Sequence, residues 1–269
     1  MNYISKKWTL LLFVWLGYSC ATAPFTGRKQ FKPLSSQQMV SLGKSNYQQV
    51  LSQEARSDQR SKAQVLKEVG RNIANAAETY LKAQGRGDLV EGFEWEFTLL
   101  EGGQVNAWAM PGGKVAFYEG ILPVCQGQDG MAVVMGHEVA HAIIGHSNER
   151  LSQQLAVQLG GVALSTALRE KPQVTQQLAM SAFGLGAQVG LLLPYSRTHE
   201  SEADEVGLYF MAIAGYDPRE APDFWQRMKQ KSSGQRPPEF LSTHPSPDRR
   251  IRALKRNVPK ALDYRNEYN

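Results

Sequence analysis

A mostly apolar stretch, VVMGHEVAHAIIGHSNER, carries three histidines and a glutamate where a core helix would carry leucine or valine. Its residues His137, Glu138 and His141 read H-E-x-x-H. Residues four apart on a helix share a face one turn apart, so the two imidazoles can point at a single metal ion. Two histidines that bind one zinc ion need this arrangement, with each ligand nitrogen about 2 Å from the metal. The stretch therefore predicts a zinc site, because burying these polar groups among apolar neighbours would otherwise be costly.

The glutamate of the pattern has a different role from the histidines. Glu138 lies about 100° around the helix from His137, away from the ligand position. Its carboxylate can take a proton from a water at the metal and later give that proton to a leaving amine. We therefore expect Glu138 to be catalytic. His146 is turned about 140° away from the face of His141 by the helical rotation, and we expect it not to bind the catalytic metal.

A third ligand must come from further along the chain, and YSRTHESEADEVGLYFMAIAGYDP is the best candidate segment. Glu200 and Asp204 are again four apart on an amphipathic helix. One carboxylate can bind zinc while the other accepts the second ring N–H of a ligand histidine. Glu202 and Glu205 lie close by, so spacing alone leaves a solvated acidic helix face open as the alternative.

The elements that must position these residues are mainly helical. Apolar periodicity predicts two helices from Ser35 or Ser36 to about residue 84, and a half-buried strand in FEWEFTLLE. Two short strands follow around the turn in VNAWAMPGGKVAFYEG. Helices are predicted near 129–149, 150–168, 173–190, 197–214, 218–232 and 246–256. The fold class is therefore α+β, mostly α-helical, with a small antiparallel sheet before the H-E-x-x-H helix.

The N-terminus indicates export. Two lysines precede the apolar run WTLLLFVWLGYSC, which is too short for a comfortable membrane span and is typical of a signal peptide over residues 1–19. Cys20 lies where a bacterial lipoprotein carries its lipidated cysteine, although Gly17 replaces the usual leucine. The alternative is cleavage at the ATA of residues 21–23, which would give a soluble periplasmic protein. We expect a linker over 20–34, one domain over 35–258 and a polar tail over 259–269.

Composition excludes some other classes of protein. The net charge of +5 comes from 30 basic and 25 acidic residues that are scattered along the chain. Without a concentrated basic stripe we expect no nucleic-acid binding. The second of the two cysteines, Cys125, is expected to be a buried thiol, because a lipidated or removed Cys20 leaves it no partner.

Three segments in order, MGHEVAHAIIGH, SRTHESEADEVG and STHPSPDRRI, resemble the gluzincin metallopeptidases of family M48. The resemblance implies a zincin-like domain with one zinc ion held by His137, His141 and Glu200, Glu138 as general acid and base, and Asp204 behind a ligand. It also implies that His244 lies near the metal and that Arg249 or Arg250 is a motif arginine. NAWAMPGG is similar to the strand that lines the family's cleft, so Asn106 and Ala107 are expected to pair with an extended substrate.

The resemblance implies a zinc endopeptidase of the bacterial cell envelope that degrades unfolded or misassembled proteins. We expect it in the periplasm, anchored by lipid at Cys20 to the outer rather than the inner membrane. Some family members carry transmembrane helices and others a C-terminal repeat domain, and we expect neither here. The alternative is an autoinhibited or weakly proteolytic chaperone or assembly factor. His244 could block the open zinc position or assist catalysis, and we favour blocking.

Overall fold

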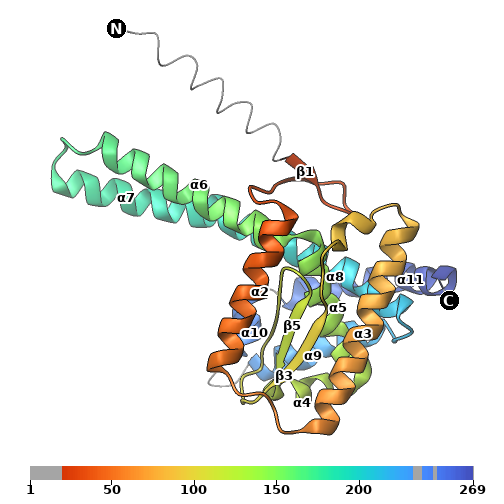
Figure 1. The fold of residues 1–269 in the computed structure, drawn as a ribbon. Coiled ribbons are helices and arrows are strands. Elements are labelled where there is room, and N and C mark those ends of the chain that lie inside the picture. Colours follow the sequence, from red (N-terminus) through yellow and green to blue (C-terminus); the bar gives the residue numbers. More distant parts are fainter. Residues whose placement is uncertain (1–19, 233–237, 245–246, 269) are drawn as a thin grey trace. The chain divides into compact units, whose positions relative to one another are not determined.

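The computed structural model describes residues 20–232, 238–244 and 247–268, so the expected signal peptide lies outside the described residues. The chain divides into a larger unit, residues 36–145 and 196–269, and a smaller unit, residues up to Ser35 and 146–195. The range expected to form one domain is thus distributed over both units. Helices dominate and two small sheets complete the fold, which confirms the mostly helical α+β class (Figure 1).

A three-stranded sheet in the order β3-β5-β4 organises the larger unit. The strands are β3 (Glu96–Leu100), β4 (Ala107–Met110) and β5 (Lys114–Tyr118). β4 and β5 form an antiparallel hairpin across the predicted turn, where Gly112 and Gly113 have φ values of 86° and 83°. β3 pairs in parallel with β5, so the sheet is mixed and not wholly antiparallel as expected. The difference arises because the chain passes from β3 to the far edge strand, and the hairpin then returns β5 beside β3.

Helices cover both faces of this sheet, and successive strand residues point to opposite faces. On one face lies α2 (Ser36–Gln53), whose Tyr47 hydroxyl is 2.6 Å from the Thr98 hydroxyl of β3. On the other face, Phe97 packs against Gly70 of α3 (Arg60–Ala83). Because both faces are covered, residues 97–100 are all buried, whereas the sequence predicted alternation.

Two helices of the larger unit meet at glycines. They are α5 (Gln128–Ile144), which also packs against β4, and α8 (Leu193–Ile213). A Cβ atom added to Gly136 would lie 2.5 Å from the carbonyl oxygen of Gly207, and one added to Gly207 would lie 2.6 Å from the carbonyl carbon of Gly136. The two backbones are therefore in contact, one residue before His137.

The C-terminal part contributes α9 (Glu220–Ser232), α10 (Glu239–Thr243) and α11 (Pro247–Tyr268). Short helices link the other elements: η1 (Gly87–Val90), η2 (Glu119–Ile121) and α4 (Leu122–Cys125), in which Cys125 is buried as expected. The range 259–269, expected to be a polar tail, continues α11 as far as Tyr268 although Pro259 lies inside the helix. Its Tyr264 and Tyr268 rings pack on Tyr80, with centroids 5.5 and 5.4 Å away.

The smaller unit combines a two-stranded ribbon and a helical hairpin. The ribbon, β1 (Cys20–Thr22) and β2 (Lys29–Phe31), lies in the range expected to be a linker. The carboxylate of Glu149 accepts hydrogen bonds from Arg28 at 2.6 and 2.8 Å and from Gln30 at 3.0 Å, which ties the ribbon to α6 (His146–Ala167).

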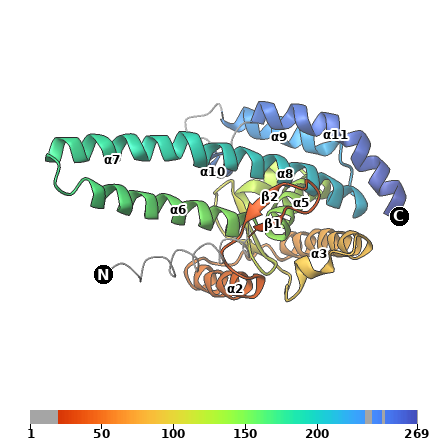
Figure 2. The ribbon, with the colours of Figure 1, turned by 90° about the horizontal axis from the view of Figure 1, so that it is seen from above.

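The hairpin pairs α6 with α7 (Gln173–Ala187), and the two helices run side by side in both ribbon views (Figures 1 and 2). α7 continues through a π-helical turn, η3 (Gln188–Leu192), into α8. Within the described residues this continuous helix, Gln173–Ile213, is the one long and apolar enough to cross a membrane by length and composition. We expected no transmembrane helix in the chain, and this helix is a candidate for one.

Candidate metal centre

The candidate site lies inside the larger unit, where two helices bring five predicted residues together and a third segment adds a sixth. α5 carries His137, Glu138 and His141, and α8 carries Glu200 and Asp204. All five are less than a tenth exposed. α5 ends directly after the motif because Gly145 takes the left-handed conformation, with φ 80°, in which glycine is unstrained. The third segment is the residue after α10, His244, which is 7% exposed.

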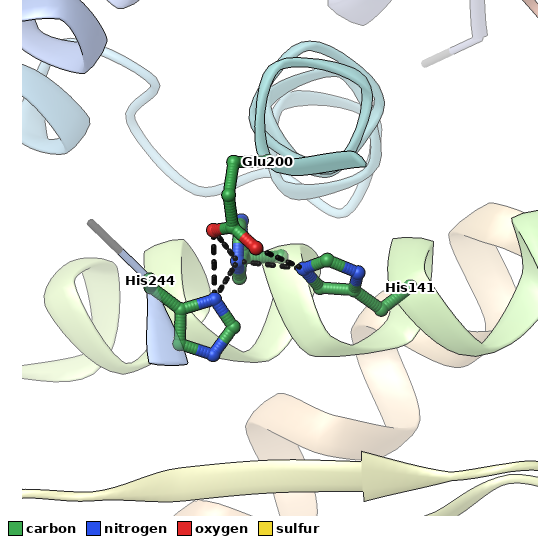
Figure 3. Close-up of side chains that lie close together, drawn as sticks. His141, Glu200 and His244 are labelled. Atoms are coloured by element: carbon green, nitrogen blue, oxygen red, sulfur yellow. Dashed lines mark hydrogen bonds and ion pairs between the residues drawn. The ribbon is translucent and has the colours of Figure 1, made fainter. Parts of the chain in front are cut away.

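Four ligand atoms converge within 4.8 Å of one another, from His137, His141, Glu200 and His244. The Nε2 atom of His137 lies 3.0 Å from Nε2 of His141 and 3.1 Å from Nδ1 of His244. Glu200 faces them from α8, with one oxygen 2.7 Å from Nδ1 of His244 and the other 3.4 Å from Nε2 of His141 (Figure 3). These side chains point at a common centre.

The donor set fits a zinc ion. Ligand atoms at about 2.0–2.1 Å from a tetrahedral zinc are about 3.3 Å apart, close to the separations seen here. The facing ring nitrogens of His137, His141 and His244 lie 3.0 and 3.1 Å apart, and each can offer a lone pair to a metal when its ring proton is on the other nitrogen. One oxygen of Glu200 is also buried without a hydrogen-bond partner among the described residues. A cation at the centre would satisfy all of these groups.

Asp204 and Arg250 hold the ligands from behind. Asp204 lies 3.1 Å from Nδ1 of His137, where its carboxylate can accept the ring proton and leave Nε2 free for a metal. The guanidinium of Arg250 binds both Asp204 oxygens and donates to Glu200 at 3.0 Å. It also lies 3.5 Å above the ring of Trp225. Burial alone would raise the pKa of Asp204, but the charge of Arg250 keeps that pKa below its usual value.

Glu138 is placed beside this donor set and not within it. Its Oε1 atom lies 3.5 Å from Nε2 of His244, and the Ala109 N–H of β4 hydrogen-bonds to its carboxylate. Burial raises the pKa of Glu138 to about 7, in the range where a carboxylate can both accept and return a proton near neutral pH. Burial lowers the pKa of His244 to about 4, so its ring is neutral at neutral pH.

The predicted substrate strand also lies near the site. β4 is an edge strand whose one neighbour is β5, and α5 packs against it. Asn106 precedes β4, and its side-chain oxygen accepts the N–H of Ala107 at 3.0 Å. Its backbone oxygen accepts from Tyr118 at 3.0 Å, so this end of the strand is fixed in place.

Sequence reasoning missed some contributors to the site. It left Arg249 or Arg250 open, and the structure brings Arg250 to the cluster. It did not identify Trp225 under the guanidinium, or Gly136 and Gly207 at the helix contact. The one signal in the sequence for the helix contact was Gly136, the glycine directly before His137. His146, which was expected not to bind, begins α6 and is not part of the donor group.

Comparison with known proteins decides the family. Residues 60–258 match the pattern of "Peptidase family M48", which is most of the chain. The chain belongs to peptidase family M48. It is 36% identical over 191 residues to "Mitochondrial metalloendopeptidase OMA1" of Schizosaccharomyces pombe, covering 70% of this chain and 53% of that protein. It is 32% identical over 271 residues to the Saccharomyces cerevisiae protein of the same name, covering 96% and 75%. A bacterial relative, "Beta-barrel assembly-enhancing protease" of Yersinia pestis, is 30% identical over 165 residues, covering 58% of this chain and 33% of that protein.

The family confirms several expectations. The resemblance to M48 was correct, and zinc is the metal that M48 metalloproteases use, so the zinc cofactor is confirmed. The prediction of a zinc metalloendopeptidase is confirmed at the level of the family. This chain spans about half the length of the Schizosaccharomyces pombe relative, 53%.

The expected location was wrong. We predicted the bacterial periplasm with an anchor in the outer membrane, but several relatives are named as mitochondrial metalloendopeptidases, which point to mitochondria. The prediction was wrong because a basic N-terminus followed by an apolar run does not by itself determine the compartment of a protein. Nothing in the comparisons bears on a lipid at Cys20.

Proposed function

We propose that this chain is a zinc endopeptidase in which His137, His141 and Glu200 hold the metal and Glu138 is the general base. The observation that carries the proposal is the convergence of buried imidazole nitrogens and a carboxylate on one centre, with a second carboxylate beside it. When bound, zinc would polarise the scissile carbonyl and lower the pKa of a nearby water.

The chain's own residues would then move the proton and position the substrate. Glu138, with its pKa near 7, accepts a proton from the attacking water and returns it to the leaving amine. Asp204 keeps the ring of His137 in the tautomer that a ligand needs, and Arg250 fixes Asp204. The open edge of β4, from Asn106 and Ala107 onward, would pair with an extended peptide through backbone hydrogen bonds.

We also propose that His244 blocks the site at rest. Its Nδ1 atom completes a four-donor set, where a catalytic zinc site keeps one position for water or substrate. A neutral ring, as the lowered pKa gives, can fill that position. Proteolysis would then require His244 to move, which keeps the basal activity low.

The proposed substrates are unfolded or misassembled proteins. Recognition by strand pairing reads the backbone and needs an extended segment, which folded proteins seldom expose. The names of the relatives, metalloendopeptidase and beta-barrel assembly-enhancing protease, support a protein substrate. The alternative, a weakly proteolytic assembly factor, is favoured by the same His244 contact, since a permanently filled donor set would bind zinc without cleaving.

Casein cleavage by the full chain, with zinc content measured in parallel, tests the proposal. We expect cleavage that a chelator abolishes and added zinc restores, at a low rate in the wild type and a higher rate in His244→Ala. A zinc-loaded chain that cleaves nothing in either form would leave the assembly factor as the better account.

A further inference from the structure

The α6–α7 hairpin lacks a core of its own. From Gln154 to Tyr195 no residue is buried, and nine of the large apolar side chains in this range are exposed. Leu159 and Leu178 are 69% and 68% exposed, and Val162 and Leu185 are 66% and 65% exposed. Soluble proteins rarely leave so many large apolar side chains of one hairpin exposed to water, so something covers them.

Charge distribution indicates what kind of partner covers the hairpin. No charged residue occurs from Leu151 to Leu168, or from Pro172 to Ser196. A helix that faces water, or docks on a protein partner from water, typically carries charges among the polar residues of its outer face, whereas these two runs carry no charge over their whole circumference. The charges lie at the ends instead: Arg150 and Arg197 at the base, and Arg169, Glu170 and Lys171 at the tip.

The lengths of the two uncharged runs match a bilayer. At 1.5 Å per residue they extend about 27 and about 37 Å, against a hydrocarbon core of about 30 Å. The second run lies in the helix that is long and apolar enough to cross a membrane by length and composition, and the apolar part of that helix is not buried. A core helix of a soluble protein would be buried, and a signal sequence would lie near the N-terminus, so neither common false match applies.

The packing between the two helices is also of the kind found in membranes. Phe183 of α7 lies against Gly160 of α6, where an added Cβ would be 2.9 Å from the ring. Small residues at a helix contact let the backbones approach where no hydrophobic effect drives the association. An α-helix pairs the backbone donors and acceptors of its interior within itself, as hydrocarbon requires.

We propose that the α6–α7 hairpin inserts its apolar surface into the hydrocarbon of a lipid bilayer, with the charged tip reaching the headgroups. The hairpin is then a membrane anchor in the middle of the chain. This proposal does not depend on peptidase activity or on bound zinc.

A depth-dependent fluorescence experiment tests the insertion. Cys20→Ser removes one thiol of the full chain, and Cys125 stays unlabelled because it is buried and burial raises its pKa to about 12. Single cysteines at Val162 or Leu185 then carry a polarity-sensitive label. Vesicles of phosphatidylcholine and phosphatidylglycerol contain a nitroxide quencher at mid-chain. A label at Leu42 is the matched control, because this leucine of α2 is also exposed, at 43%, but lies outside the hairpin.

We expect the labels at Val162 and Leu185 to shift to the blue and lose most of their emission, while the label at Leu42 loses none. Adding the pair Leu159→Glu and Leu178→Glu should abolish the quenching at Val162. Because the N-terminal apolar run can bind vesicles by itself, unquenched hairpin labels on a vesicle-bound chain would overturn the proposal. A second outcome would also overturn it: energy transfer in vesicle-free buffer between copies labelled with different dyes at Val162, together with no quenching in vesicles. In that case a second copy of the chain would cover the apolar surface.

Discussion

At the scale of single residues, Glu138 separates catalysis from metal binding. It lies next to the donor group and is not one of the four grouped residues. Glu138→Gln should therefore keep the zinc content of the wild type and lower casein cleavage about a hundredfold or more. Metal analysis and initial rates measure both quantities, with Glu91→Gln, an exposed position, as the control. Wild-type cleavage by Glu138→Gln would remove the assigned mechanism.

The two carboxylates of α8 should differ in their effect on zinc. Glu200 faces three histidine rings, whereas Asp204 is not one of the four grouped donors and acts on them through His137 and Arg250. Glu200→Gln should strip most of the zinc, and Asp204→Asn should weaken zinc affinity about ten- to a hundredfold. Competition with a chromogenic chelator measures both affinities. Greater zinc loss from Glu202→Gln than from Glu200→Gln would show that the wrong carboxylate was assigned.

His244 gives opposite results for its two possible roles. If it blocks the site, His244→Ala should raise casein cleavage while one zinc stays bound to the remaining three donors. If it stabilises the transition state, the same change should lower the turnover number about a hundredfold. The turnover number at saturating casein measures the difference. Unchanged cleavage would mean that the 3.1 Å contact with His137 serves neither role.

At the scale of the elements, the contact between α5 and α8 sets the distance between the ligand pairs. Gly207→Ala would place a methyl group 2.6 Å from the backbone of Gly136 and must push the helices apart. Such overpacking costs about 1–3 kcal/mol and should weaken zinc binding as well as stability. Gly184→Ala is the matched control, because nothing lies within 4 Å of its added Cβ. The unfolding temperature and the zinc affinity should both fall in Gly207→Ala, and neither should fall in Gly184→Ala.

The elements also show what sequence can and cannot predict. Spacing of four residues predicted the faces of His137 with His141 and of Glu200 with Asp204, because a helix fixes such pairs locally. The meeting of Gly136 with Gly207 is a contact between distant segments, and no local pattern encodes it. The choice between Arg249 and Arg250 depends on where α11 begins. The range 259–269 was expected to be a polar tail, but it is helical as far as Tyr268 with Pro259 inside the helix, and Ala261, Tyr264 and Tyr268 follow helical spacing.

At the scale of the whole molecule, zinc should act as a cross-link within the larger unit. Its proposed donors come from α5, α8 and the segment after α10, so one bound ion would join three segments that are distant in the sequence, and one oxygen of Glu200 is buried without a hydrogen-bond partner among the described residues. A ligand that binds only the folded state adds about 2.7 kcal/mol of stability at a free concentration one hundred times its Kd. Chelation should therefore lower the unfolding temperature of the full chain.

Hydrogen exchange locates this effect and makes the prediction specific. On chelation, protection should fall in α5, α8 and α11 of the larger unit and stay unchanged in the α6–α7 hairpin, which contributes no donor to the described cluster. Glu138→Gln should show the same loss on chelation as the wild type, because it keeps all proposed ligands. Glu200→Gln should already lack the protection before chelator is added. An equal loss across both units would mean that zinc stabilises the chain by a route other than this site.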